Sequence, residues 1–370
     1  MKNFYTTLLL IIISCNCLGQ VFTNKLIGKK GVLLSDSIKS TEYPYVLPLL
    51  GKKAAAAGFD LPYPVGMSVN YLWQESSLRI SNLKVGVNGS EQFNLDQIVR
   101  FNDATATSTG LNFRPDFWLF PFLNVYGIIA ASNTSTEVDF GIFLPDENGY
   151  QEIFNYRTIA EFEATSFGFG MTPTIGVGGG WMALDMNFTW TDIPELEKPA
   201  FAFIFGPRIG KSFDLRRKDR NINFWVGGFR IQLRSDTEGN IALSKILPED
   251  GNFEDRIFDA QNAVIDKQAE VDEWWNGLTP LEQQLNERIY DAAIAGLQGA
   301  NELLTRLEAA GSRVESSTIQ YSLDKGQEQL WNFVVGSQFQ LNKNWMIRME
   351  YGFLGSRNQL IAGLQYRFGL

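Results

Sequence analysis

The side chains that carry most enzyme chemistry are nearly absent from this sequence. Its 370 residues include no histidine and two cysteines, Cys15 and Cys17. The sequence therefore excludes His-based acid/base catalysis, Ser-His-Asp and Cys-His nucleophiles, and His-ligated metals. A pair such as Asp116 and Asp185 could in principle carry out acid/base work, but no spacing singles these carboxylates out. We expect no enzyme activity, no cofactor and no bound metal.

The charge balance of the chain is acidic. Lys and Arg number 32 against 41 Asp and Glu, which gives a formal net charge of −9. A protein that wraps nucleic acid needs the opposite sign, so we expect no nucleic-acid partner. Hydrophobic residues make up 45% of the chain, too large a share for a disordered protein. Aromatic residues at 13%, together with 34 glycines, favour β-structure over helix.

Residues 1–19 have the composition of an export signal. Lys2 gives a short positive start, an apolar run follows from Leu8 to Ile13, and small and polar residues lead to Gly19-Gln20. This order is typical of a secretory signal peptide, and the apolar run is too short to span a bilayer as a helix. The run Ile12-Ile13-Ser14-Cys15 also resembles the lipobox of bacterial lipoproteins, which would make Cys15 an acylated N-terminus. Either processing predicts an exported protein without a disulfide framework.

The C-terminal third alternates between apolar and polar residues with a period of two, as β-strands with one apolar face do. In the last strand the apolar parity consists of Leu360, Ala362, Leu364, Tyr366, Phe368 and Leu370. The other parity, small and mostly polar, consists of Ile361, Gly363, Gln365, Arg367 and Gly369. Residues 331–340 and 345–353 repeat this pattern, and so do six segments between Met67 and Leu233.

A secreted β-sandwich would produce the same alternation, with its apolar residues inside. Three features favour a membrane barrel instead. The apolar face is rich in aromatic residues at the strand ends, the strands have the length of about ten residues that a tilted membrane strand needs, and the polar face suits a wet interior. After the signal, no segment has the run of about 18 apolar residues that a membrane helix needs. A membrane protein of this sequence must therefore be a closed barrel.

The chain ends on a strand, Tyr366-Arg367-Phe368-Gly369-Leu370. This ending resembles the C-terminal strand by which Gram-negative outer-membrane barrels are recognised for insertion, although those barrels usually end on Phe. The resemblance implies an all-β transmembrane antiparallel barrel over residues 66–370, with about 12–14 strands. It also implies the outer membrane of a Gram-negative bacterium as the location, with membrane lipid and the barrel-insertion machinery as partners. The doubtful strands in this count are 78–104, 137–145, 241–247 and 317–323.

Two segments do not follow the alternation. Residues 20–65 are interrupted by prolines, and we expect them to form either an ordered lead-in or a plug in the lumen. Residues 250–312 instead have helical spacing, and Thr279-Pro280-Leu281-Glu282 combines an N-cap, a first-turn proline and a capping box. We expect an α-helical hairpin inserted between two strands. Its acidic face is either simply solvated or binds a protein partner.

The side of the membrane on which the hairpin lies depends on the number of strands before it. If residues 222–235 run directly into the insert, the hairpin is extracellular. If 236–240 and 324–326 are turns, two more strands exist and the hairpin is periplasmic. The sequence leaves both alternatives open.

Strand parity also predicts which charged side chains point into the barrel. The predicted lumen-lining residues are Arg114, Asp116, Asp185, Arg208, Arg230, Arg348, Glu350 and Arg367. They form either a charged constriction that selects solutes or a ladder of ion pairs that fills a closed lumen. The surplus of Arg over acids favours anionic or zwitterionic solutes. The two functional hypotheses are porin-like passage of small solutes and a non-conducting structural or docking barrel that acts through its helical hairpin.

Overall fold

The computed structural model describes residues 20–21, 35–40, 42–96, 98–146, 149–177, 179–217, 219–233, 236–245 and 252–370. Residues 1–19, to which the signal-peptide and lipobox predictions apply, lie outside the described residues. Most of the first third of the lead-in, residues 22–34, also lies outside them.

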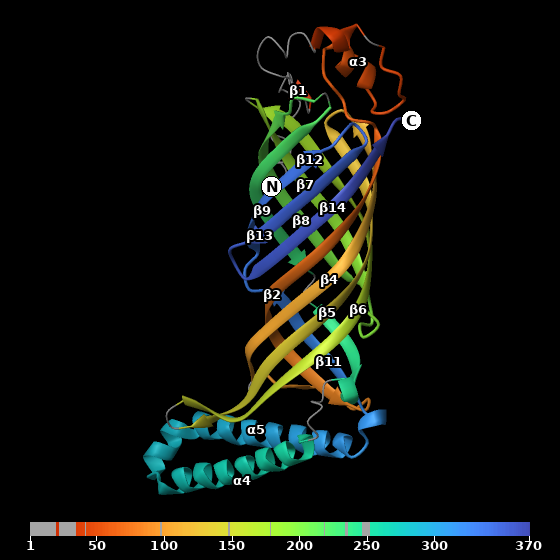
Figure 1. The fold of residues 1–370 in the computed structure, drawn as a ribbon. Helices are drawn as coiled ribbons and strands as arrows, with labels where there is room; N and C mark the ends of the chain where they lie inside the picture. The colour runs from red at the N-terminus through yellow and green to blue at the C-terminus, as the bar shows by residue number, and fades with distance from the viewer. Residues whose placement is uncertain are drawn as a thin grey trace, which may run out of the picture.

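Ten antiparallel strands of the described chain close into a barrel (Figure 1). They are β2 (Val65–Val87), β4 (Val99–Phe120), β5 (Leu123–Asp146), β6 (Gly149–Val177), β7 (Gly180–Asp192), β8 (Ala200–Asp214), β9 (Asn221–Leu233), β12 (Trp331–Gln340), β13 (Trp345–Phe353) and β14 (Arg357–Phe368). The ring closes at the first half of β2, which pairs with β14 on one side and with β4 on the other. A closed ring leaves no strand edge unpaired, which is what a membrane demands of a β-structure.

Two further strands lengthen the wall at one end. β10 (Asp236–Ala242) pairs with β11 (Thr318–Gln327), and β11 pairs with the second half of β2. Two very short strands, β1 (Gln20–Val21) and β3 (Phe93–Asn94), pair with β6 and β2. The predicted antiparallel barrel of about 12–14 strands with an inserted helical hairpin is confirmed, although only ten of the strands form the ring.

An apolar belt surrounds the half of the barrel nearer the C-terminus. Its exposed outward side chains include Met67, Val69, Tyr71, Leu111, Phe113, Ile129, Phe167, Phe169, Met182, Ile209, Phe224, Phe333, Ile347, Met349 and Leu364. On β2 the outward apolar stretch runs from Val65 to Trp73. At about 3.3 Å per residue and a tilt of about 40° it is about 23 Å tall, close to the band of about 25 Å in outer-membrane barrels. The belt is therefore of membrane-spanning height.

The polarity of the wall reverses beyond this belt. On β5 the outward residues change from Ile129 and Ala131 to Asn133, Ser135 and Glu137. The inward residues change in the opposite sense, ending in a buried apolar cluster that includes Ile142. The strands β2, β4, β5 and β6 have 23, 22, 24 and 29 residues, far more than the roughly ten that span a bilayer. The halves of these four strands nearer the hairpin therefore form a water-exposed extension with an apolar core.

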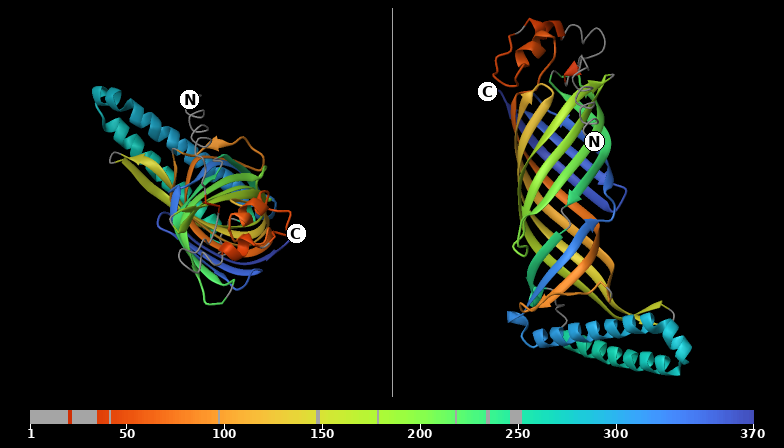
Figure 2. Two further views of the ribbon diagram at one scale, coloured as in Figure 1. Left: turned by 90° about the horizontal axis from the view of Figure 1, so that it is seen from above. Right: turned by 180° about the vertical axis from the view of Figure 1, so that it is seen from behind.

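A helical hairpin covers the far end of this extension (Figures 1 and 2). It consists of α4 (Phe253–Gly277) and α5 (Pro280–Gly311). The hairpin shares one core with the strands, in which Leu297 and Leu304 of α5 and Ile257 of α4 pack with Ile142 of β5. Among the described residues, no helix is long and apolar enough to cross a membrane.

The predicted capping box at the start of α5 is present. The carboxylate of Glu282 accepts a hydrogen bond of 2.8 Å from the backbone N–H of Thr279 and one of 2.6 Å from its hydroxyl. The hydroxyl bond, followed by the backbone bond, lowers the pKa of Glu282 below its ordinary value. The sequence thus located the turn between the two helices correctly.

The insert leaves and re-enters the barrel at one end. Residues 236–240 and 324–326, which the periplasmic alternative requires as turns, belong to strands β10 and β11. In Figure 1 the hairpin lies at the opposite end from the C-terminus. That other end carries residues 42–64, including α3 (Gly51–Ala56), which lie beyond the strand ends and not between the strands (Figure 2). Backbone hydrogen bonds from Val46 to Leu370 and from Leu49 to Leu119 hold this segment at the rim.

Candidate functional site in the barrel lumen

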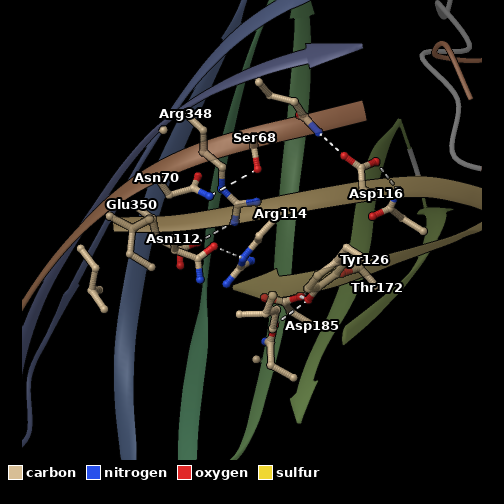
Figure 3. Close-up of a pocket in the computed structure, with 18 of the residues that line it drawn as sticks. Ser68, Asn70, Asn112, Arg114, Asp116, Tyr126, Thr172, Asp185, Arg348 and Glu350 are labelled. Carbon is tan, nitrogen blue, oxygen red and sulfur yellow. Dashed lines mark hydrogen bonds and ion pairs between the residues drawn. The ribbon is translucent and has the colours of Figure 1, made fainter. Parts of the chain in front are cut away.

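The candidate site is a cavity of about 450 Å³ in the membrane half of the barrel. Side chains from all ten strands of the ring line it, because every second residue of each strand points inward. Figure 3 shows its polar wall, to which β2, β4, β5, β7 and β13 all contribute labelled residues. The lumen of this half is therefore hydrophilic inside an apolar exterior, as in outer-membrane barrels.

Arg208 is the centre of the ion-pair network in this cavity. Its guanidinium binds Glu350 through two hydrogen bonds of 2.8 Å each, from Nε and Nη2. Its Nη1 lies 3.1 Å from Oδ2 of Asp185. The three residues come from β8, β13 and β7, so the network joins parts of the wall that are not adjacent in the sheet.

The two carboxylates of this network are saturated with donors. Asp185 also accepts hydrogen bonds from the hydroxyls of Tyr126 and Thr172. Glu350 also accepts one of 2.7 Å from the indole N–H of Trp225, and Arg348 lies 3.3 Å from the same oxygen. A carboxylate with this many donors is a poor general base, because its lone pairs are already engaged.

A second ion pair lies at the rim nearer the C-terminus. Arg367 Nη1 is 2.8 Å from Oδ1 of Asp116, and both side chains are buried. Asp116 also accepts hydrogen bonds from Asn124 and Gln365, of 2.8 and 2.9 Å. Arg367 donates from Nε to the carbonyl of Tyr63, which ties the lead-in to the last strand. Asp116 and Asp185 therefore belong to separate ion-pair networks.

Arg114 also lines the cavity, without a carboxylate partner among the described residues. Its Nε donates a hydrogen bond of 3.1 Å to Asn112, and its guanidinium lies 5.2 Å from the ring centroid of Tyr126. In Figure 3, Arg114 and Arg348 point into the same part of the cavity. Their remaining N–H groups are available to a guest molecule.

The structure places seven of the eight predicted residues in the cavity wall; Arg230 is the exception. Arg230 pairs across the strands with Phe205 and Trp331, whose side chains lie on the outer face. The prediction for β9 was wrong because both faces of this strand are apolar: Phe224 faces outward, while Trp225 faces the lumen. Arg230 therefore lies among aromatic rings on the outside, as long cations near a membrane interface do.

Apolar side chains form the floor of the cavity. Phe229 and Ile231 of β9 pack with Val334 of β12, and all three are buried. A second buried cluster of Leu78, Ala104 and Ala106 lies on the strands beyond Ser76. Beyond that begins the shared core of strands and hairpin. Further buried apolar clusters therefore lie on the strands between the polar cavity and the hairpin end, with the buried Arg357 beside Phe229.

Sequence reasoning missed several residues of the site. Tyr126, Thr172 and Trp225 complete the two saturated carboxylates. The alternation of β5 and β6 contained the signal for Tyr126 and Thr172, since both share the parity of their polar neighbours. Trp225 could not be found in this way, because an inward tryptophan looks like a lipid-facing one. The described residues contain no group of three or more acidic or Cys side chains that could hold a metal ion.

No protein-family model matches the chain, and the comparison with curated proteins gives no match either. Among solved structures, the chain is similar to the β domain of the Bordetella autotransporter BrkA, with 9% identity, a TM-score of 0.29, and coverage of 82% of this chain and 100% of that one. It is also similar to the translocator domain of the autotransporter NalP from Neisseria meningitidis, with 6% identity, a TM-score of 0.30, and coverage of 91% and 93%. The COG4313 outer membrane channel from Pseudomonas putida F1 shares 8% identity at a TM-score of 0.27, over 84% of this chain and 97% of that one. At these values the similarities carry no argument about function.

Proposed function

We propose that the protein is an outer-membrane β-barrel that does not conduct solutes and that holds its helical hairpin outside the cell as a docking element. The observation that carries this proposal is the apolar filling of the barrel beyond the cavity floor. In this proposal, three buried apolar clusters in the extension close the lumen beyond the polar cavity.

The filling is too extensive to open by a local fluctuation. A path to the hairpin end would have to pass the layers of Phe229 and Leu78 and then the core around Leu304. Each fully buried Leu, Ile or Phe side chain stabilises the closed state by about 1.5–3 kcal/mol, so exposing several at once costs on the order of 10 kcal/mol. The hairpin itself would also have to leave its place.

The composition of the hairpin supports a docking role. Between Phe253 and Gly311 there are twelve acidic and four basic residues, nearly the whole net charge of the chain. Among them α5 exposes an apolar stripe of Leu281, Leu285 and Ile289, which are 67%, 75% and 50% accessible. Apolar side chains at i, i+4 and i+8 on a solvent face are unusual for a helix without a partner. The partner that fits is a protein with a basic surface around an apolar patch.

The placement of the hairpin outside the cell rests on the lengths of the connections. At the end that carries the C-terminus, β4 and β5 are joined by residues 121–122 and β12 and β13 by residues 341–344. The hairpin end carries the long insert of residues 234–330 between β9 and β12. Outer-membrane barrels have short periplasmic turns and long extracellular loops.

Cysteine labelling in intact cells of the native host tests this proposal. The single substitutions are Asn276→Cys at the hairpin tip, Leu285→Cys in the stripe and Lys52→Cys on α3, and the unsubstituted chain gives the background. A membrane-impermeant maleimide should label Asn276→Cys and not Lys52→Cys; the reverse result would contradict display outside the cell. A docked partner should protect Leu285→Cys until a wash with high salt removes it. Equal labelling before and after the wash would count against docking.

Passage of small solutes is the second candidate, favoured by the polar cavity of about 450 Å³. It requires a second conformation in which the floor around Phe229 opens. The two candidate functions predict different conductances for the full chain: none for the docking barrel and a measurable one for solute passage.

A further inference from the structure

We propose that the lumen cavity binds a small hydroxylated carboxylate with one negative charge, held by Arg114 and Arg348. This site is separate from the hairpin and does not depend on whether the barrel conducts.

The cavity wall carries a surplus of positive charge. The lining contains four arginines, Arg114, Arg208, Arg348 and Arg367, and three carboxylates, Asp116, Asp185 and Glu350. Arg367 and Asp116 pair at the rim and cancel. The central group therefore contains three guanidinium groups and two carboxylates, which leaves one positive charge without a counter-charge.

The hydrogen bonds place this surplus on two residues. Arg208 is engaged by both carboxylates, with contacts of 2.8 Å to Glu350 and 3.1 Å to Asp185. Among the described residues, Arg114 donates a hydrogen bond to the amide oxygen of Asn112 and lies against the face of Tyr126, and Arg348 donates to a shared oxygen of Glu350 and lies against the face of Trp225. Both also interact electrostatically with Asp185 at longer range, without an ion pair within 4 Å among the described residues. Arg348 is 39% exposed, within the cavity. Within the central group, the guanidinium groups least engaged by carboxylates thus belong to Arg114 and Arg348.

The charged residue beneath the cavity floor, Arg357, does not compensate for the surplus positive charge of the cavity. Arg357 is 2% exposed and lies 5.1 Å from the ring centroid of Phe229, and none of its guanidinium nitrogens has a hydrogen-bond partner among the described residues. It adds a second positive charge to the same enclosed region. An unpaired cation inside a membrane barrel is costly, so an anion that enters the cavity gains from both charges.

The remaining side chains of the cavity wall indicate which groups the bound molecule has besides its carboxylate. Amide side chains recur around it, among them Asn70, Asn223 and Gln338, which offer both donors and acceptors. Trp181 and Trp225 lie together on one side, with ring centroids 6.1 Å apart, and the indole N–H of Trp181 has no partner among the described residues. Amides beside an aromatic surface suit a compact body with several hydroxyl groups. A volume of about 450 Å³ holds one such molecule.

Calorimetric titration of the refolded full chain in detergent, at low ionic strength, tests the site with D-glucuronate as the probe. D-glucose is the matched control, since it has the same ring without the carboxylate. We expect glucuronate to bind one to one and at least tenfold more tightly than glucose, because the charge-assisted bonds are lost with the carboxylate. Equal affinity for both sugars, or no heat up to 10 mM glucuronate, would overturn the proposal.

Two substitutions locate the site, and each is first checked for folding by its gel mobility with and without boiling. Arg114→Gln and Arg348→Gln should each weaken glucuronate binding at least tenfold and so reduce its advantage over glucose. Arg230→Gln, which removes an arginine from the outer face, should leave both affinities unchanged. If the Arg114→Gln barrel does not fold, Arg348→Gln decides alone. Unchanged glucuronate affinity in a folded Arg348→Gln barrel would refute the assignment.

Discussion

At the scale of single residues, the lumen is organised around buried carboxylates that have exhausted their hydrogen-bonding capacity. Glu350 is 3% exposed and accepts from Arg208, Arg348 and Trp225. Strand parity predicts that Glu350 and Arg208 point inward, since it assigns each residue to a face. Parity cannot predict their pairing, because they stand 142 positions apart and meet only through closure of the ring.

Removal of Arg208 should destabilise the barrel strongly. Arg208→Gln leaves Asp185 and Glu350 buried without their shared cation, which we expect to cost about 3–5 kcal/mol of unfolding free energy. Urea unfolding in lipid vesicles measures this change in unfolding free energy. Arg230→Gln is the matched control, with an expected change within about 0.5 kcal/mol because the side chain lies on the surface. A loss of less than about 1 kcal/mol for Arg208→Gln would contradict the network described here.

At the scale of elements, each long strand has a membrane-facing segment followed along its length by a water-facing segment. β5 presents apolar residues to the outside as far as Ala131 and polar residues from Asn133 onward. Residues 137–145, a doubtful strand on sequence alone, form the end of β5, where the polarity is reversed. The period of two nevertheless continues through the reversal. Alternation thus predicts a strand, and the sense of the alternation indicates which medium surrounds it.

One pair of substitutions on the outward face of β5 tests this boundary. Ile129→Arg puts a charge in the apolar belt and should cost about 2–4 kcal/mol. Ser135→Arg puts the same side chain six positions further along the same face, where it should cost at most about 0.5 kcal/mol. Unfolding in lipid vesicles compares the two variants. Equal costs would mean that the belt does not end between these positions.

The helical hairpin shows what helical spacing can and cannot predict. The sequence predicted a hairpin over 250–312, and α4 and α5 fall within those bounds. Leu285 and Leu304 both belong to the apolar residues that recur at helical spacing along α5. Leu304 is fully buried against the strands, whereas Leu285 is 75% exposed. Helical spacing predicts which face of a helix is apolar. How much of that face is buried depends on how far the strands beneath the helix extend.

Leu304 and Leu285 allow a second matched pair of substitutions, one at a buried and one at an exposed position of α5. Leu304→Ala should destabilise the packing of the hairpin by about 2–5 kcal/mol, because it leaves a cavity in a closed core. Leu285→Ala should change stability by no more than about 0.5 kcal/mol. Limited proteolysis of the barrel in vesicles, with cleavage followed in α4 and α5, measures the difference. Equal protection of both variants would contradict a hairpin that packs only near its base.

At the scale of the whole molecule, the protein combines a membrane barrel with a water-exposed extension. The first has a polar lumen and an apolar exterior, and the second has an apolar core and a polar exterior. Sequence alone predicted the barrel, its strand directions and the insert. It did not predict the extension, because a reversed polarity at unchanged period was not distinguished from a weak strand. It also predicted β9 the wrong way round, since a filled lumen permits Trp225 and Phe229 to face inward.

The conductance of the full chain, inserted alone into a planar bilayer, tests the central claim most directly. The buried apolar clusters around Phe229, Leu78 and Leu304 predict no current over a range of voltages, from a preparation first checked for a folded barrel by its gel shift on boiling. Discrete, reproducible current steps from the same preparation would show an open path and contradict the closed lumen.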